Sequence, residues 1–188
     1  IEQAEKLGFD AGGNDISVEA VNYAKKNNLN VFLGEIKELN LPNDFYDVVT
    51  SIGTIEHFRD PREEISEAFR ILKNQGLFIV LTLSTSNPIG RGAIKPPEHL
   101  YYFSRNNLSK LLSMFNFETI KTYGNFTFYS FEEFIFHFLG RFFQEKKFLK
   151  LENILDKFAS ILRLNKIPIP IPDGQFLLVC RKNDKKVT

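Results

Sequence analysis

The chain has 188 residues, of which 43% are hydrophobic and 25% charged, a composition typical of one globular domain and unlike that of a disordered or collagen-like chain. The 24 Lys and Arg residues nearly balance the 23 Asp and Glu residues, and a net charge of +1 excludes an overall basic field for binding nucleic acid. The single cysteine, Cys180, excludes a disulfide within the chain, and no signal peptide or apolar run of about 18 residues is visible, so we expect a cytoplasmic protein.

The sequence alternates between helical and strand patterns. Ser17, Asp60 and Ser104 are good helix N-caps, and Pro61 suits a first helical position. The continuous apolar centre of residues 46–51 favours a strand buried on both faces. The alternation predicts an α/β Rossmann-like sheet that is mainly parallel, with helices on its faces. In chain order, we predict a helix over 1–8 ended by Gly8, a strand segment ending at Asp15, a helix over 18–27, strands at 31–33 and 46–51, a helix from 61 to about 74, a strand at 77–83, a helix over 105–115, and strands at 117–123 and 175–181.

An unusual stretch precedes the last predicted strand. Phenylalanine and leucine recur at helical spacing over 131–164, and the alternating prolines of 167–172 require an extended chain. We interpret 131–172 as a helical insertion or lid within a single domain of residues 1–188. Residues 131–162 can cover an apolar acceptor or contact a membrane surface, or they can cover the sheet or contact another copy of the chain.

Ligands bind at the carboxyl ends of the strands in open α/β sheets. Four stretches follow the predicted strands there: Asp15, Glu35, residues 51–53 and residues 84–99. A carboxylate at the first position can accept hydrogen bonds from both hydroxyls of a ribose. An Asp after a strand is also common as a turn residue or a helix cap.

Four segments occur in the order and spacing of a known family. GNDIS (13–17), VFLGEIKELNLPNDFYDVVTSIGTIEHFRDP (31–61), ILKNQGLFIVLT (71–82) and PPEHLYYFS (96–104) resemble class I S-adenosylmethionine-dependent methyltransferases. The resemblance is to the small-molecule branch (methyltransferase types 11 and 23) that includes the quinone-biosynthesis methyltransferases. It covers roughly residues 1–123 and implies the fold of that family, with an antiparallel last strand.

The resemblance implies S-adenosylmethionine as cofactor and gives individual residues roles. Asp15 would bind the ribose hydroxyls, Glu35 stands where the family usually has an Asp at the adenine amino group, and Ile36 would pack on the adenine ring. Glu56 and His57 would face the mouth of the active site. The implied cofactor-binding residues are Asp15, Ile16, Glu35, Ile36, Ser51, Ile52 and Gly53, and the implied catalytic residues are His57 and His99.

Two histidines are candidates for acid–base chemistry. Imidazole titrates near neutral pH, so His57 or His99 can remove a proton from an acceptor hydroxyl. His57 can instead hydrogen-bond at a helix start, and His99 can close a loop. Methyl transfer from a sulfonium need not use a base, because alignment in a dry site supplies much of the rate. His57, His99 and His137 lack the spacing of a metal site, so we predict no metal ligands.

The sequence departs from the family pattern at its start. No GxGxG loop, which in the family holds the carboxypropyl end of the cofactor, is present, and neither is the strand before it. In the family that strand lies between the strands that here contain Asp15 and Tyr46, so each of these would have one unpaired edge. Because residue 1 is Ile, we expect an N-terminally truncated domain that binds the cofactor poorly by itself.

The sequence therefore predicts an enzyme that, in the intact protein, transfers a methyl group from S-adenosylmethionine to a small-molecule acceptor. We expect no nucleic-acid partner. No GxxxxGK[ST] phosphate loop and no G-x-S-x-G elbow is present, which excludes two other common α/β functions. The alternative is a degenerate, non-catalytic methyltransferase-like domain that serves as a binding or scaffold module.

Overall fold

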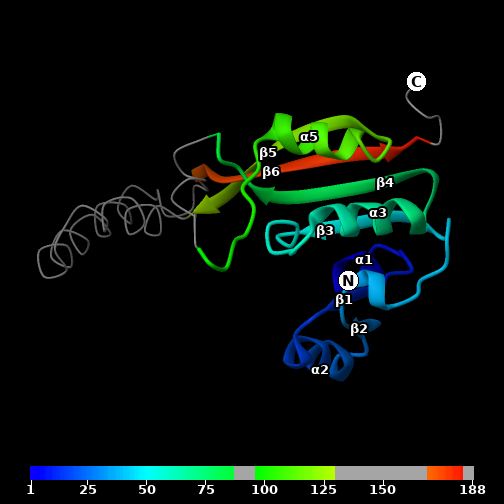
Figure 1. Cartoon of the computed structure of the whole chain (residues 1–188). Helices are drawn as coiled ribbons and strands as arrows, with labels where there is room; N and C mark the ends of the chain where they lie inside the picture. Colours follow the sequence, from blue (N-terminus) through cyan, green and yellow to red (C-terminus); the bar gives the residue numbers. More distant parts are fainter. Residues whose placement is uncertain (87–95, 130–168, 184–188) are drawn as a thin grey trace, which may run out of the picture.

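The computed structural model describes residues 1–86, 96–129 and 169–183 (Figure 1). The predictions for the helical stretch 131–164, for residues 131–168 of the lid 131–172 and for the contact surface 131–162 lie outside the described residues, whereas residues 169–172 of the predicted lid belong to β6. The described elements are, in chain order, α1 (Glu2–Lys6), β1 (Gly13–Asp15), α2 (Val18–Lys26), β2 (Val31–Leu33), the 3-10 helix η1 (Ile36–Glu38), β3 (Tyr46–Ile52), α3 (Pro61–Ile71), β4 (Leu72–Leu83), α5 (Arg105–Ser113), β5 (Phe117–Tyr129) and β6 (Ile169–Lys182).

The described strands form two separate sheets. β1 and β2 form a parallel pair, and the larger sheet has the order β3–β4–β6–β5. Within the larger sheet β3 and β4 are parallel, whereas β6 is antiparallel to both β4 and β5. The arrangement is therefore a mixed α/β sheet, and the prediction of an antiparallel last strand is confirmed.

The helices begin where side-chain caps are available. The Ser17 hydroxyl accepts a hydrogen bond from the Ala20 amide (3.2 Å), and the Asp60 carboxylate accepts one from the Arg62 amide (2.9 Å). Ser104 and Asn107 form a reciprocal capping box at the start of α5. These caps satisfy amide groups that have no partner inside the helix, and they confirm the three predicted helix starts.

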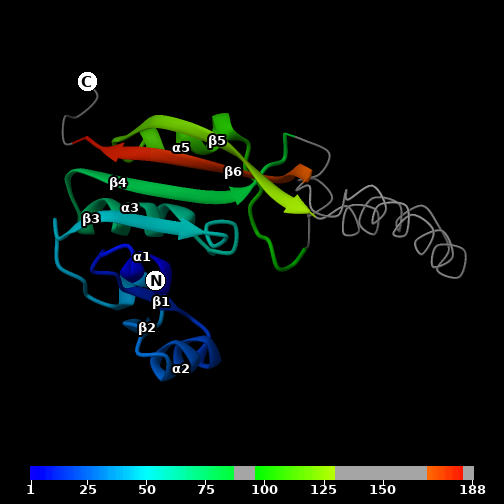
Figure 2. The same ribbon diagram turned by 180° about the vertical axis from the view of Figure 1, so that it is seen from behind.

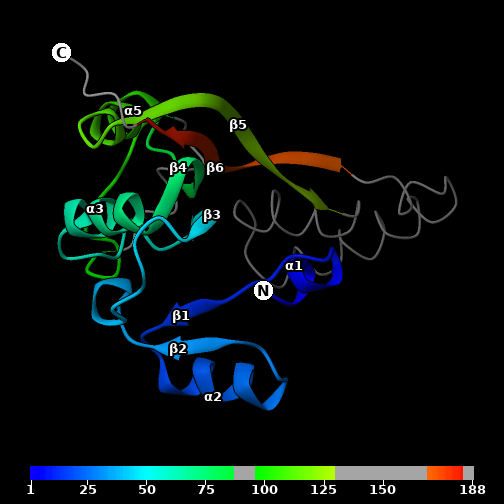
Figure 3. The same cartoon turned by 90° about the vertical axis from the view of Figure 1, so that its right-hand side faces the viewer.

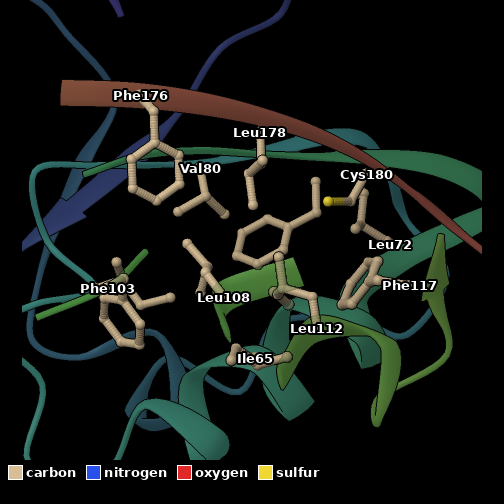
Figure 4. Packing of buried hydrophobic residues seen from close by; sticks show 13 residues of the cluster. Ile65, Leu72, Val80, Phe103, Leu108, Leu112, Phe117, Phe176, Leu178 and Cys180 are labelled. Atoms are coloured by element: carbon tan, nitrogen blue, oxygen red, sulfur yellow. The ribbon is translucent and has the colours of Figure 1, made fainter. Parts of the chain in front are cut away.

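α3 and α5 both lie on one face of the larger sheet, and their apolar side chains form the core (Figures 1 and 4). Alternate residues of β4 and β6 point into this layer, because successive strand residues face opposite sides of a sheet. Figure 2 shows the opposite face, over which the described residues place no helix. The buried cluster consists of Ile55, Ile65, Ala68, Leu72, Phe78, Val80, Phe103, Leu108, Leu112, Phe117, Phe176, Leu178 and Cys180.

The expectation that the strand at 46–51 is buried on both faces is wrong for the described part of the chain. Val48 is 42% exposed and Ile52 is 60% exposed. The reason is that both neighbouring helices cover the same face. β3 also pairs only with β4, so its other edge has no strand beside it among the described residues.

The free edge of β3 has a counterpart in the small sheet. β1 pairs only with β2 in the described part of the chain. Figure 3 shows β1 and β2 lying across the view and apart from β3, whose neighbours are on its far side. Both strands that were expected to have an unpaired edge therefore have one in the structure.

Several element boundaries differ from the sequence prediction. The helix predicted to reach about residue 74 ends at Ile71, and the chain then enters β4 directly. β5 extends to Tyr129 rather than residue 123. The prolines of 169–172 lie in β6 but pair only with β5, which agrees with their exclusion from a strand with two neighbours.

Lys182 is a buried cation at the end of β6, with a side chain 5% exposed. Its ammonium group lies 2.7 Å from the Asp44 carboxylate and donates a hydrogen bond of 2.7 Å to the Leu72 carbonyl. It also lies 4.5 Å from the centre of the Phe69 ring. These contacts compensate the lost hydration of the charge and join β6 to the segment before β3.

In the described part of the chain, no helix combines the length and the apolar character that crossing a membrane requires.

The core makes a direct prediction for stability. Phe176 is fully buried, so Phe176→Ala should lower the free energy of unfolding by about 3–5 kcal/mol through lost burial and an unfilled cavity. Urea denaturation measures this change. Phe9→Ala is the matched control because Phe9 is 64% exposed, and it should change stability by less than about 1 kcal/mol. Equal losses in the two variants would contradict the described core.

Candidate active site

Asp15 lies at the carboxyl end of β1 and is exposed. One of its carboxylate oxygens accepts a hydrogen bond from the Ser17 amide (2.8 Å), which is the turn role that sequence reasoning left open. No described residue donates to its second oxygen. The Gly34 amide donates to the Asp15 carbonyl (3.0 Å), which holds the ends of β1 and β2 together.

Glu35 follows β2 through a turn that needs glycine. Gly34 has a φ of +122°, a conformation that other residues rarely adopt. The turn places Glu35 at the start of η1, where its carboxylate lies 3.1 Å from the Lys37 ammonium group. Lys37 also pairs with Glu63 of α3 at 2.6 Å. The hydrogen bond to Glu63, together with that to Glu35, holds the pKa of Lys37 above its usual value.

Glu64 lies beside this ion-pair network and is 9% exposed. Burial raises its pKa from 4.5 to about 7, and the nearby charge of Glu35 adds to the effect. A carboxylate with this pKa is partly protonated at neutral pH, because desolvation disfavours the charged form. The carboxyl end of β2 is therefore linked electrostatically to α3.

The end of β3 carries the predicted residues 51–53 on an open surface. Gly53 has a φ of +61°, and a side-chain carbon added there would have no atom within 4 Å. Its amide donates to the Leu81 carbonyl (2.9 Å), and the Ser51 hydroxyl lies 2.6 Å from that of Thr54. A ligand can therefore approach the backbone closely at this point.

His57 and His99, predicted from separate stretches, meet beyond the end of β3. Their ring centres lie 4.8 Å apart in an edge-to-face arrangement. The Glu56 carbonyl accepts hydrogen bonds from the amides of Leu100 (2.8 Å) and Tyr101 (3.2 Å), so the two loops are held together by their backbones.

Thr82 is a member of this site that the sequence pattern did not single out. It is 1% exposed, and its hydroxyl donates to the buried Glu56 carboxylate (2.8 Å). The sequence signal that could have identified Thr82 is its position as the one polar residue in the otherwise apolar run of residues 77–83. Its role was invisible because its partner lies 26 residues earlier in the chain.

The predicted residues form two groups rather than one. Asp15, Ile16, Glu35 and Ile36 lie at the small sheet, whereas residues 51–53 lie at the end of β3 with His57 and His99. The strands of the two sheets run in different directions in Figure 3. Among the described residues, the ion pair between Lys37 and Glu63 links η1 beside the small sheet to α3.

A hollow of about 420 Å³ opens beside the second group. None of the predicted cofactor-binding or catalytic residues lines it. It borders the site through Tyr101, whose hydroxyl donates to the Arg59 carbonyl (3.0 Å). The hollow is lined by Arg59, Asp60, Pro61, Arg62, Tyr101, Phe103 and Leu111.

Comparison with known families gives one match, to a family model described as "Methyltransferase domain". The match covers residues 1–122, which include every predicted site residue.

Two curated proteins are similar over shorter stretches. One from Mycolicibacterium smegmatis, named a probable S-adenosylmethionine-dependent methyltransferase, is 37% identical over 95 residues, which are 50% of this chain and 37% of that protein. A chloroplastic 2-methyl-6-phytyl-1,4-hydroquinone methyltransferase from Oryza sativa is 39% identical over 51 residues, 27% of this chain and 16% of that protein. The matched stretches thus span 37% of the first relative and 16% of the second, well under two thirds of either protein.

The fold is shared with solved structures. A methyltransferase from Archaeoglobus fulgidus, described as dependent on S-adenosylmethionine, superposes with a TM-score of 0.64 at 18% identity, covering 96% of this chain and 80% of that one. The α/β Rossmann-like methyltransferase fold predicted from the sequence is therefore confirmed.

The buried carboxyl group predicts a pH-dependent stability. Between pH 4.5 and about 7 the folded state keeps a proton on Glu64 that the unfolded state loses, so the free energy of unfolding falls as pH rises through this window. Glu64→Gln should raise stability by about 1–3 kcal/mol at pH 8 and change it little near pH 5.

Chemical denaturation at several pH values measures this effect. Glu118→Gln is the control, because Glu118 is exposed on β5, and this variant should keep the loss of stability that Glu64 causes as pH rises. A Glu64→Gln variant with the pH dependence of the unsubstituted protein would contradict the raised pKa.

Proposed function

This chain belongs to the methyltransferase domain family, and on that premise we propose that the protein transfers a methyl group from S-adenosylmethionine to a small-molecule acceptor. The observation that carries the proposal is the family match over residues 1–122, which spans both groups of predicted site residues. The rice relative, named for a hydroquinone, supports an acceptor of small-molecule type.

The residues at the carboxyl ends of β1 and β3 fit the nucleoside part of the cofactor. The second Asp15 oxygen has no partner among the described residues, so it can accept a hydrogen bond from a ribose hydroxyl. Ile16 is 75% exposed and Ile52 is 60% exposed, and these apolar side chains can cover an uncharged ring. The open space at Gly53 leaves room for close approach of the backbone.

S-adenosylmethionine supplies a methyl group that is already activated on a positively charged sulfur. The chain's own residues then have to bind the cofactor and the acceptor, align them with each other and exclude water. Glu35 can meet the adenine side only while it shares its carboxylate with Lys37. The 188 residues contain no GxGxG loop for the carboxypropyl end, so we predict that they bind the cofactor weakly.

The two histidines can handle a proton on the acceptor side. Nδ1 of His57 lies 2.7 Å from the Glu98 carbonyl, which accepts its hydrogen. The lone pair of His57 is then on Nε2, and that atom can accept a proton from an acceptor hydroxyl. His99 offers a second imidazole 4.8 Å away, measured between ring centres.

A second function is a binding or scaffold domain of the same family that performs no chemistry. Two observations favour it: the 188 residues lack a GxGxG loop, and the Glu35 carboxylate is already paired with Lys37. Cofactor binding separates the two functions, because a scaffold domain has no need of it.

The proposal predicts that Asp15 contributes to cofactor binding. The unsubstituted protein should bind S-adenosylhomocysteine, the demethylated product, in a calorimetric titration. Asp15→Asn keeps an oxygen for the Ser17 amide but removes the charge, and it should weaken binding about 10- to 100-fold.

Asp10→Asn is the matched control, since Asp10 lies in the exposed segment before β1, and its affinity should be unchanged. Folding of each variant is checked by thermal denaturation. Absence of binding by the folded, unsubstituted protein would favour the scaffold function, and equal affinity in the Asp15→Asn variant would remove the role of Asp15.

A further inference from the structure

Three side chains of metal-ligating type converge where the loop after β3 meets the loop before α5. One ligand atom from each of Glu56, His57 and His99 lies within 4.8 Å of the other two. We propose that these residues bind a divalent transition-metal ion, with zinc as the best fit. This goes beyond the proposed methyl transfer, and it revises the expectation, based on histidine spacing alone, that the chain has no metal ligands.

The backbone brings the three ligands together without help from an ion. The Glu56 carbonyl accepts hydrogen bonds from two amides of the opposite loop, and the Tyr101 hydroxyl donates to the Arg59 carbonyl. A parallel bridge between Ser84 and Phe103 holds the same loop to the end of β4. A site that is assembled in this way loses little further conformational freedom when an ion binds.

His57 is oriented as metal-binding histidines usually are. Its Nδ1 donates to the Glu98 carbonyl at 2.7 Å, which fixes the ring and leaves the Nε2 lone pair for an ion. A hydrogen bond from the second ring nitrogen to a carbonyl is the common support of a ligating imidazole, and it raises the basicity of the ligand.

His99 has a nitrogen that requires a partner. Its Nδ1 is buried and has no hydrogen-bond partner among the described residues, and the same is true of the Tyr102 hydroxyl nearby. The two rings lie 6.2 Å apart, measured between their centres. Buried polar atoms without a partner are rare in folded proteins, and a bound ion would satisfy the nitrogen.

Glu56 is a buried carboxylate with no ion-pair partner in the described part of the chain. It is 4% exposed, and one oxygen accepts a hydrogen bond from Thr82. No Lys, Arg or His within the described ranges forms an ion pair with it. Because buried carboxylates are normally paired or bound to metal, the missing positive charge is best supplied by a divalent ion.

The set of two imidazoles and one carboxylate favours zinc among common ions. Mg²⁺ and Ca²⁺ prefer all-oxygen ligands, whereas zinc is often bound by two His and one Glu with a fourth position open. Fe²⁺ uses the same set and is the second candidate. Tetrahedral zinc holds its ligand atoms about 3.4 Å apart, so a pair of ligand atoms 4.8 Å apart must close by about 1.4 Å.

The open position gives the ion a place in the proposed reaction. It would bind an oxygen of the acceptor, and the two ring nitrogens would then act as ligands rather than as bases. This last step rests on the proposed methyl transfer, but binding of the ion does not. Metal affinity is measured without donor or acceptor, so its failure and the failure of the proposed function are distinguishable.

Calorimetric titration of the metal-free protein with Zn²⁺ tests the proposal. We expect one ion per chain, together with a higher thermal unfolding temperature when zinc is present. His99→Ala and Glu56→Gln should each weaken binding by more than 100-fold. Thr82→Val removes only the hydroxyl that supports Glu56 and should weaken binding about 10- to 100-fold.

His137→Ala is the matched control, because it removes the third histidine of the chain but none of the proposed ligands. Its zinc affinity should equal that of the unsubstituted protein. Co²⁺ in place of Zn²⁺ should give the intense visible absorption of a tetrahedral ion in the unsubstituted protein and not in the His99→Ala variant.

The proposal is overturned if the folded protein binds no zinc, or if a His57→Ala/His99→Ala double variant binds it with unchanged affinity. Loss of binding in the His137→Ala variant would also overturn it. If the His99→Ala variant fails to fold without metal, the Thr82→Val variant still tests the proposal. That variant keeps all three ligands and loses only the hydroxyl that supports Glu56.

Discussion

The position of β4 in the larger sheet is the constraint on which the rest of the structure depends. β4 pairs with β3 on one edge and with β6 on the other, and α3 and α5 cover one of its faces. Because side chains alternate along the strand, Thr82 lies on the same face of β4 as the buried apolar residues. From this face its hydroxyl reaches Glu56. Thr82, and through it Glu56, is therefore held by a strand that has neighbours on both edges, which gives these side chains fixed positions.

Local features were predictable from sequence because short-range physics determines them. The three helix caps and the range of β2 were correctly expected from residue types within one turn of each element. The burial of β3 was not, because its apolar pattern does not reveal which neighbours cover each face. The meeting of Glu56, His57 and His99 was also beyond local reasoning, since the loops that carry them are distant in sequence and joined by backbone hydrogen bonds.

The family match and the geometry support each other at different levels. The match covers the residues at both strand ends, and the fold is that of Rossmann-like methyltransferases. The geometry adds two features of this chain, the ion pair between Glu35 and Lys37 and the cluster of Glu56, His57 and His99. In the proposed function, the ion pair would affect the contact with adenine, and the cluster would face the acceptor. Fold alone does not determine the acceptor, because acceptor-binding residues vary on a shared scaffold.

We propose that the carboxyl ends of β1, β2 and β3 bind one S-adenosyl ligand. The most direct test is an amide ¹H–¹⁵N correlation spectrum of the protein recorded during titration with S-adenosylhomocysteine. We expect concentration-dependent shifts at residues 13–17, 34–36 and 51–53, with little change at the core residues of α5. Shifts confined to other surfaces, or none at saturating ligand, would contradict it.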